Sequence, residues 1–248
     1  MTLAVIGRGR VGRSLALAAE LSGIEVRLAG HDEAAESSGD AGAILICVPD
    51  DAIASVCSRI GTDAPPLVGH VSGATTLGAL ASAIERGAAA FSLHPLQTFA
   101  DGETAVEGTP AAIAGSTDGA LDFARDLAAT LGMRPFEVAE ENRAAYHAAA
   151  AIASNLLVAL EESAAELLER AGVEDARELL SPLVLRTAAN WAERGPDALT
   201  GPVARGDAAT VERHRAALAD TAPQLLPLYD ALARRAEAIA GESLGQVP

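Results

Sequence analysis

The chain has 248 residues, half of them apolar but only 3% aromatic, and its formal net charge is −16. This length allows one large domain or two ordinary ones, with a core built from aliphatic side chains. The acidic balance excludes nucleic acid and anionic membranes as expected partners. All 18 basic residues are arginine, so a mechanism that needs a catalytic lysine of this chain is excluded as well.

The first twelve residues predict a nucleotide-binding turn. An apolar strand at Thr2–Ile6 leads into glycines with the spacing G-x-G-x-x-G and then into a helix. The first glycine permits a sharp bend, the second leaves room for a diphosphate, and the third lets the helix pack against the strand. The alternative is a glycine-rich turn without a ligand, and the flanking strand and helix favour the nucleotide. The expected contact residues are Gly7, Arg8, Gly9, Arg10, Val11 and Gly12.

Strands and helices alternate as far as residue 139, at the spacing of a parallel sheet. The run at 43–48 is continuously apolar, which is typical of a strand covered on both faces. We therefore predict the fold class α/β, with a doubly wound Rossmann domain at residues 1–139. Further strands are expected at 24–28, 43–48, 67–71, 89–93, 111–114 and 134–138. Helices are expected at 13–21, 52–60, 74–86 and 118–131.

From residue 140 every segment has helical periodicity, which predicts an all-helical domain at 140–248. Its helices are expected at 140–171, 175–192, 207–219 and 223–240, with a Gly- and Pro-rich linker at 199–206. The apolar run 144–160 contains polar residues, and it is more typical of a buried helix than of a membrane span. One small bundle cannot cover so apolar a helix, so we expect a homodimer.

The two cysteines, Cys47 and Cys57, have neither CxxC nor zinc-ligand spacing, and no metal site is expected. Cys47 falls inside an apolar strand and is expected to be a buried structural thiol. The chain begins directly with a strand, without the basic start and apolar segment of a signal peptide. A cytoplasmic protein is therefore expected.

Ligands of open α/β sheets bind beyond the carboxyl ends of the strands. The glycine turn converges there with residues 48–50, 70–73 and 92–95, and Val48 and Pro49 are expected to contact the cofactor. His94 stands at a strand end beside a proline, where it is expected to donate a proton or bind substrate; capping a turn is the alternative. Ser72 is a weaker candidate, because Ser-Gly after a strand is also ordinary turn chemistry.

The residues after the second strand bear on the choice between NAD and NADP. Asp32 lies twenty residues after Gly12, which suits the ribose of NAD. The acid should nevertheless stand at the strand end, near Ala29, where there is none. Arg8 and His31 could instead meet a 2′-phosphate, so NADP is favoured and NAD remains open.

Four polar residues share one face of the first helix of the second domain: Tyr146, His147, Ser154 and Asn155. They are expected to form a wall of the substrate pocket, with a satisfied network in the core as the equal alternative. Asp207 can cap the third helix. Arg205 is free to hold a substrate carboxylate, or it forms a solvated pair with an aspartate.

The chain resembles a family of Rossmann-like NAD(P)-dependent oxidoreductases with a C-terminal helical domain of unknown function, within the 6-phosphogluconate-dehydrogenase-like group. The resemblance covers nearly the whole chain. Its specific stretches are residues 70–73, 92–99, 146–155 and 201–207. Prephenate dehydrogenases, ketopantoate reductases and pyrroline-carboxylate reductases are relatives. His94-Pro95 resembles the His-Pro motif of prephenate dehydrogenases, and Ser72 sits where that family has a substrate-side serine.

The expected function is hydride transfer between NADP(H) and a small carboxylate-bearing carbonyl, imine or alcohol, with a 2-oxo acid such as ketopantoate as the leading substrate. His94 and His147 are the expected acid–base residues, and Ser72 and Asn155 orient the reacting oxygen. Arg205, Ser72 and Tyr146 contact the substrate. The alternatives are a prephenate-like alcohol oxidation and a non-catalytic NADPH-binding sensor. β-Hydroxyacid dehydrogenases and standard ketopantoate reductases use a catalytic lysine, which this chain lacks.

Overall fold

The computed structural model describes residues 1–37, 39–61 and 66–244 and divides into two compact units. The first unit spans Met1–Ser154 and the second Asn155–Pro248. The sequence predicts a boundary after residue 139, whereas helix α6 (Arg143–Ala153) stays with the first unit. Arg143, at its start, is hydrogen-bonded to Ser92 in the sheet and to Ser72, which follows a strand of the sheet, and so ties the helix to the first unit.

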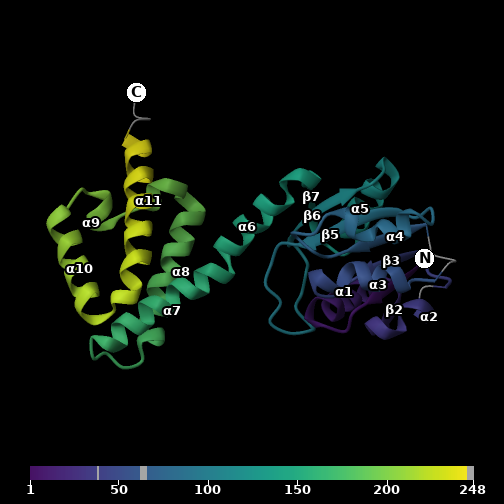
Figure 1. The fold of residues 1–248 in the computed structure, drawn as a ribbon, viewed down its shortest axis with the longest axis horizontal. Helices are drawn as coiled ribbons and strands as arrows, with labels where there is room; N and C mark the ends of the chain where they lie inside the picture. The colour runs from purple at the N-terminus through teal and green to yellow at the C-terminus, as the bar shows by residue number, and fades with distance from the viewer. Residues whose placement is uncertain (38, 62–65, 245–248) are drawn as a thin grey trace. The chain divides into compact units, whose positions relative to one another are not determined.

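Within the described residues the first unit holds one seven-stranded sheet, with the strand order β2-β1-β3-β4-β5-β6-β7. Figure 1 shows the two units of the chain as ribbons. Its strands are β1 (Thr2–Ile6), β2 (Glu25–Ala29), β3 (Ala43–Ile46), β4 (Leu67–His70), β5 (Ala89–Pro95), β6 (Pro110–Gly115) and β7 (Arg134–Glu137). All neighbouring strands are parallel except β5 and β6. The segment 96–109 between these two has no helix to carry the chain across the sheet, so the strand direction reverses. The predicted α/β fold is confirmed, with this one antiparallel pair as the difference.

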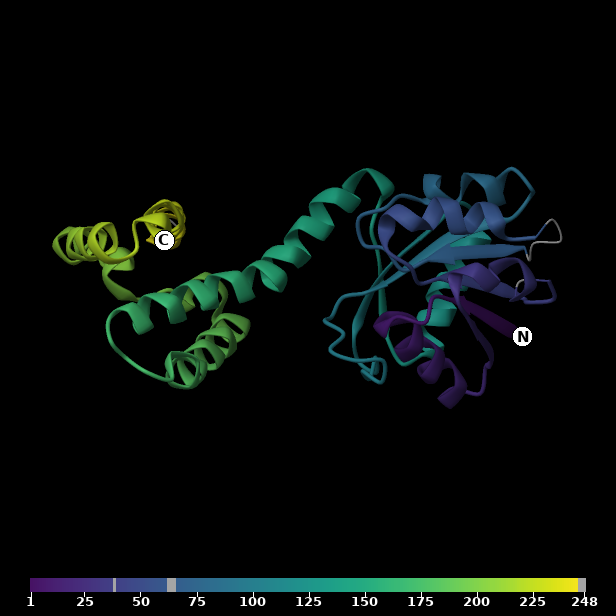
Figure 2. The same cartoon turned by 60° about the horizontal axis from the view of Figure 1, so that its bottom comes forward.

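Helices cover both faces of the sheet: α1 and α5 pack on one face, and α3 and α4 on the other (Figure 2). The first unit contains α1 (Arg10–Leu21), η1 (His31–Glu33), α2 (Ala34–Ser37), η2 (Asp50–Ala52), α3 (Ile53–Arg59), η3 (Leu77–Leu80), α4 (Ala81–Ile84), α5 (Asp118–Thr130), η4 (Glu140–Asn142) and α6. The η elements are 3-10 helices. The helix predicted at 74–86 is thus the short pair η3 and α4.

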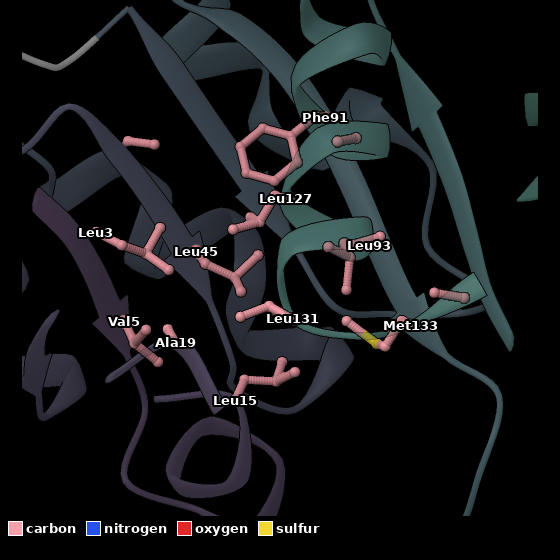
Figure 3. Close-up of a cluster of buried hydrophobic side chains, with 14 of the residues drawn as sticks. Leu3, Val5, Leu15, Ala19, Leu45, Phe91, Leu93, Leu127, Leu131 and Met133 are labelled. Atoms are coloured by element: carbon pink, nitrogen blue, oxygen red, sulfur yellow. The ribbon is translucent and has the colours of Figure 1, made fainter. Parts of the chain in front are cut away.

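Alternation along β1 shows how one strand serves two cores. Leu3 and Val5 join the cluster under α1 and α5, shown in Figure 3, while Ala4 and Ile6 join the cluster under α3. Successive side chains of a strand point to opposite faces, so a continuously apolar strand is what a doubly covered sheet requires. Cys47 lies in the first cluster, without a disulfide, as predicted. Burial also raises the pKa of its thiol.

The second unit is all-helical in its described part, as predicted. It comprises α7 (Asn155–Arg170), α8 (Ala176–Arg194), η5 (Gly195–Ala198), α9 (Gly201–Ala204), α10 (Ala208–Thr221), η6 (Pro223–Leu225) and α11 (Leu226–Leu244). The predicted helix 140–171 is interrupted at Ser154, whose φ of −129° and ψ of −85° are not helical. A short helix, α9, occupies part of the predicted linker. Asp207 caps α10 by accepting a hydrogen bond from the Thr210 amide at 3.0 Å, as predicted.

Within the described residues, one helical stretch is long and apolar enough to cross a membrane by length and composition alone. It is Glu140–Arg170, and 6% of its most apolar window is buried. The sequence predicts burial of this run, whereas Leu156 and Val158 are 56% and 63% exposed in the single chain. The helices of the second unit therefore leave these two side chains uncovered.

Candidate functional site

The glycine turn between β1 and α1 is closed to side chains at two of its three glycines. Gly7 has a φ of +127°, and a Cβ there would lie 2.1 Å from the carbonyl oxygen of Cys47. A Cβ at Gly12 would lie 1.9 Å from the carbonyl oxygen of Gly7. By contrast, a Cβ at Gly9 would meet nothing within 4 Å. The turn therefore needs the outer glycines for its own packing, while the absence of a side chain at Gly9 leaves open space.

The surroundings of this open space suit a phosphate. Gly9 is the N-cap of α1 and has no side-chain cap, so the amides of the first helical turn are directed towards it. Val48 and Pro49 follow β3, which pairs with β1, and so they lie at the same sheet edge as the glycine turn. These residues form a cradle that fits the diphosphate of a dinucleotide.

Arg8 is engaged by a carboxylate that the sequence reading did not single out. Its guanidinium donates to both carboxylate oxygens of Glu33, at 3.2 and 2.8 Å. Glu33 also accepts from the amide of Gly30 at 3.1 Å. Nε2 of His31 lies 3.2 Å from the carboxylate oxygen Oδ1 of Asp32. The two residues predicted to meet a 2′-phosphate thus each have an acidic neighbour, and Glu33 accepts from two of the N–H groups that Arg8 could offer a phosphate.

A second cluster gathers around His94, near the end of β5. Its Nδ1 lies 2.7 Å from the hydroxyl of Tyr146, and the ring of His147 lies 6.0 Å away between centroids. A Cβ at Gly73 would lie 2.9 Å from Nε2 of His94 and 2.7 Å from Cδ2 of His147. The structure therefore brings together His94, Tyr146 and His147, predicted as site residues, with Gly73 against the two imidazoles.

Burial makes His94 a neutral group at pH 7. Desolvation, and then the charges of His147 and Arg143, lower the pKa of His94 to about 4. Desolvation likewise raises the pKa of Tyr146 to about 12. The pair therefore holds an imidazole and a phenol, both uncharged, which can exchange hydrogen bonds with a substrate oxygen.

Arg143 anchors the helix that carries Tyr146 and His147. Its side chain is 1% exposed and donates to Oγ of Ser92 at 2.8 Å and to the carbonyl oxygen of Ser72. Its nearest carboxylate oxygen belongs to Glu140, at 3.6 Å from Nη1. Sequence reasoning missed Arg143. The available signal was a lone arginine in an alanine-rich helix, three residues before Tyr146 and so on the same helical face.

Ser72 and His70 shape the turn beneath this cluster. The hydroxyl oxygen of Ser72 accepts from the amides of Ala74 and Thr75, at 3.2 and 2.9 Å. The fully buried His70 accepts from the amide of Ser72 at 3.2 Å. These hydrogen bonds are those of an ordinary turn, which was the alternative interpretation of Ser72. Its predicted role towards the substrate stays a prediction.

Asn155 and Arg205 belong to the second unit. Asn155 begins α7, and Arg205 directly follows α9. Hydrogen bonds from Thr210 lower the pKa of Asp207, and the charges of Arg213 and Arg205 add to this effect. Their predicted roles towards the substrate stay predictions.

The lowered pKa values of two buried histidines predict that the unfolding free energy depends on pH. Unfolded histidine titrates near pH 6.5, whereas burial lowers the pKa of His70 and of His94 to about 4. As the pH falls, the unfolded chain therefore takes up protons first, and the unfolding free energy decreases between about pH 6.5 and about pH 4. Thermal unfolding of the wild type and His94→Gln at stepwise pH measures this, and the variant is expected to lose less stability. The exposed His31→Gln variant is the control. An unchanged slope in His94→Gln would contradict the assignment.

Residues 109–236 match a family model described as a domain of unknown function, DUF2520. The chain belongs to the DUF2520 family. The matched part begins in the first unit and ends in the second, and it includes His147, Arg143 and Tyr146. The predicted resemblance to a family with a C-terminal domain of unknown function is thereby confirmed. No curated protein sequence matches the chain.

Solved structures share the whole fold of this DUF2520 member. A candidate NADP oxidoreductase from Bacteroides fragilis is 24% identical, with a TM-score of 0.77 over 96% of this chain and 98% of its own. A protein from Thermotoga maritima is 23% identical, with a TM-score of 0.77 over 97% and 99% of the two chains. A reductive aminase from Aspergillus terreus, solved with NADPH, is 17% identical, with a TM-score of 0.68 over 97% of each. At these identities the likeness establishes the fold.

Proposed function

We propose that this protein is an NAD(P)-dependent oxidoreductase that transfers a hydride between NADP(H) and a small carboxylate-bearing carbonyl compound. A 2-oxo acid such as ketopantoate is the first substrate to test. The observation that carries the proposal is the contrast between the closed positions Gly7 and Gly12 and the open position Gly9. The open position at Gly9 is also the uncapped N-terminus of α1, where the backbone amides of the first helical turn can bind a diphosphate.

The residues proposed to hold the cofactor are those of the turn, together with Val48, Pro49 and, for a 2′-phosphate, Arg8 and His31. When bound, the nicotinamide supplies or accepts the hydride. The chain has to manage the proton, and it has no lysine for that purpose. His94 is proposed to bind the reacting oxygen as a neutral imidazole, and the proton that this oxygen gains or loses is proposed to be exchanged with His147 beside it or with water. Ser72 and Asn155 are proposed to orient that oxygen, and Arg205 to hold the carboxylate.

The test is a titration of the purified full chain with NADPH and NADH, followed by assays of cofactor oxidation. The panel contains 2-oxo acids, cyclic imines and, in the reverse direction, hydroxy acids including prephenate. We expect binding of NADPH and turnover with one class of the panel. Binding without turnover across the panel favours the sensor. No detectable affinity for either coenzyme would overturn the proposal.

Arg8 provides a test of the choice between the two coenzymes. Replacing Arg8 with Ala removes the guanidinium proposed to leave Glu33 for the 2′-phosphate. A hydrogen bond to a charged group is worth enough that NADPH affinity should fall about tenfold to 100-fold, while NADH affinity changes little. Fluorescence titration with both coenzymes measures the ratio. Arg59→Ala, which removes an exposed partner of Asp32, is the matched control. Equal losses for both coenzymes would contradict NADP preference.

A homodimer is proposed because large apolar side chains of the second unit are not covered by the helices of that unit. Leu183, Leu185 and Trp191 of α8 are 63%, 71% and 66% exposed, in addition to the leucine and valine of α7 noted above. Monomers rarely leave so many large apolar side chains in water. A second copy of the chain, related by a twofold axis, would cover the same face on both subunits. Light scattering with size-exclusion chromatography measures the mass.

A further inference from the structure

Tyr146 is held against His94 by contacts from two strands. Its ring meets that of His94 edge-on, with centroids 5.6 Å apart and planes at 88°. Phe136 of β7 meets the Tyr146 ring in the same manner at 5.9 Å. Arg143, one helical turn earlier, fixes α6 to Ser92 of β5. The 2.7 Å contact between the hydroxyl and Nδ1 is therefore supported by packing from β5, β7 and α6.

The direction of this hydrogen bond follows from the donor and acceptor strengths of the two groups. A neutral imidazole carries one N–H and one lone pair, and a phenol can donate once. Among the described residues, the hydroxyl of Tyr146 has His94 as its side-chain hydrogen-bond partner. Whichever group donates, one proton stays outside this bond: the phenol O–H or the imidazole N–H. A phenol is a more acidic donor than a neutral imidazole, and an imidazole nitrogen is a more basic acceptor than a phenol oxygen, so the arrangement in which the phenol donates is lower in energy.

We propose that Tyr146 is a positioning residue: its phenol donates to Nδ1 of His94 and keeps the imidazole proton on Nε2. The pKa of the phenol, about 12, and that of the imidazole, about 4, leave both groups neutral at pH 7, as this arrangement requires. The sequence predicted a substrate contact for Tyr146. The geometry assigns its hydroxyl to the imidazole.

The Nε2 edge of His94 faces the place where Gly73 has no side chain. A Cβ at Gly73 would stand 2.9 Å from both Nε2 and Cε1. An N–H fixed on Nε2 therefore lies beside the turn after β4, whereas the phenol binds the other ring nitrogen. If the proposed function holds, Nε2–H donates to the reacting oxygen of the substrate, and this catalytic role rests on that proposal. The tautomer itself is a property of the free protein.

Nitrogen-15 NMR of the histidine rings in the full-length protein at pH 7 tests the proposal. In the wild type we expect an unprotonated Nδ1 and a protonated Nε2 for His94, with the signals assigned by their loss in His94→Gln. Tyr146→Phe removes the donor, and the ratio of the two tautomers should shift by about tenfold, the value of one hydrogen bond. With a substrate, kcat should fall by a similar factor while KM changes little.

The chain offers a matched control. Tyr229 of α11 places its hydroxyl 3.0 Å from Nδ1 of His214, so Tyr229→Phe removes the same group from a second pair. It should change the signals of His214 and leave those of His94 unchanged. A protonated Nδ1 on His94 in the wild type, or an unaltered tautomer ratio in Tyr146→Phe, would overturn the proposal. The wild-type measurement decides even if the variant does not fold. If the protein does not bind NADPH, the proposed function is wrong, but the tautomer of His94 in the free protein is a separate result.

Discussion

Gly9→Ala is expected to abolish coenzyme binding while leaving the fold intact. The backbone at Gly9 has a φ of −73° and a ψ of −179°, which alanine adopts without strain, and a Cβ there meets no protein atom within 4 Å. We therefore expect the unfolding free energy to change by no more than about 1 kcal/mol. The added methyl group takes the space proposed for the diphosphate, so NADPH affinity should fall about 100-fold or more, which corresponds to about 2.7 kcal/mol.

Gly12→Ala is the comparison variant, because it is expected to change both stability and binding. A methyl group at position 12 overlaps the carbonyl oxygen of Gly7, so the turn or the helix has to move. We expect a loss of about 3 kcal/mol in stability, together with lost binding. Thermal unfolding and fluorescence titration of both variants separate the effects. If Gly9→Ala binds NADPH as the wild type does, the diphosphate does not lie at this turn.

The second large effect is expected at His94. Replacing it with Ala removes the imidazole that is proposed to bind the reacting oxygen and leaves Tyr146 without its partner. Removing one hydrogen-bond donor to a reacting oxygen costs about 100-fold or more in turnover, and we expect a loss of that size in kcat with NADPH affinity retained. Assays with the substrate class identified from the panel, together with coenzyme titration, measure the two quantities.

His214→Ala serves as the control for this variant, since it removes an exposed imidazole paired with a tyrosine in the second unit. Its turnover should match that of the wild type. An unchanged rate in His94→Ala would remove His94 from the mechanism and leave His147 as the imidazole to test next. Because His94 stays neutral above its pKa of about 4, we expect its contribution to kcat to persist from pH 8 down to about pH 4.

Much of the fold could be predicted because its signals are local. The run at β3 is apolar at every position, and β1 places alternate residues in two different cores. Such patterns identify a doubly covered sheet without tertiary information. The reversal at β6 could not be predicted in this way, because strand direction depends on how residues 96–109 cross the edge of the sheet. The interruption of the long helix at Ser154 is likewise a backbone event within a sequence that stays helical in composition.

For the candidate site, the sequence indicated the strand ends but not the partnerships between them. His94, Tyr146 and His147 were singled out by their positions, and the structure brings them together. Arg143 and Glu33 were missed because their importance comes from contacts between residues far apart in the chain. Arg143 reaches Ser92, 51 residues away, and Glu33 reaches Arg8, 25 residues away. Pairings at such separations leave no periodic pattern in one sequence.

The reversal of strand direction between β5 and β6 limits which loops can be changed to alter ligand preference in this protein. Five neighbouring strands, β2, β1, β3, β4 and β5, run in one direction, so the turns that follow them open on a common side. β6 starts on that side instead of finishing there. Changes of ligand preference can therefore be introduced through five turns with little disturbance, whereas β6 and β7 serve as a fixed wall beside them. Libraries aimed at altered selectivity should vary those turns first.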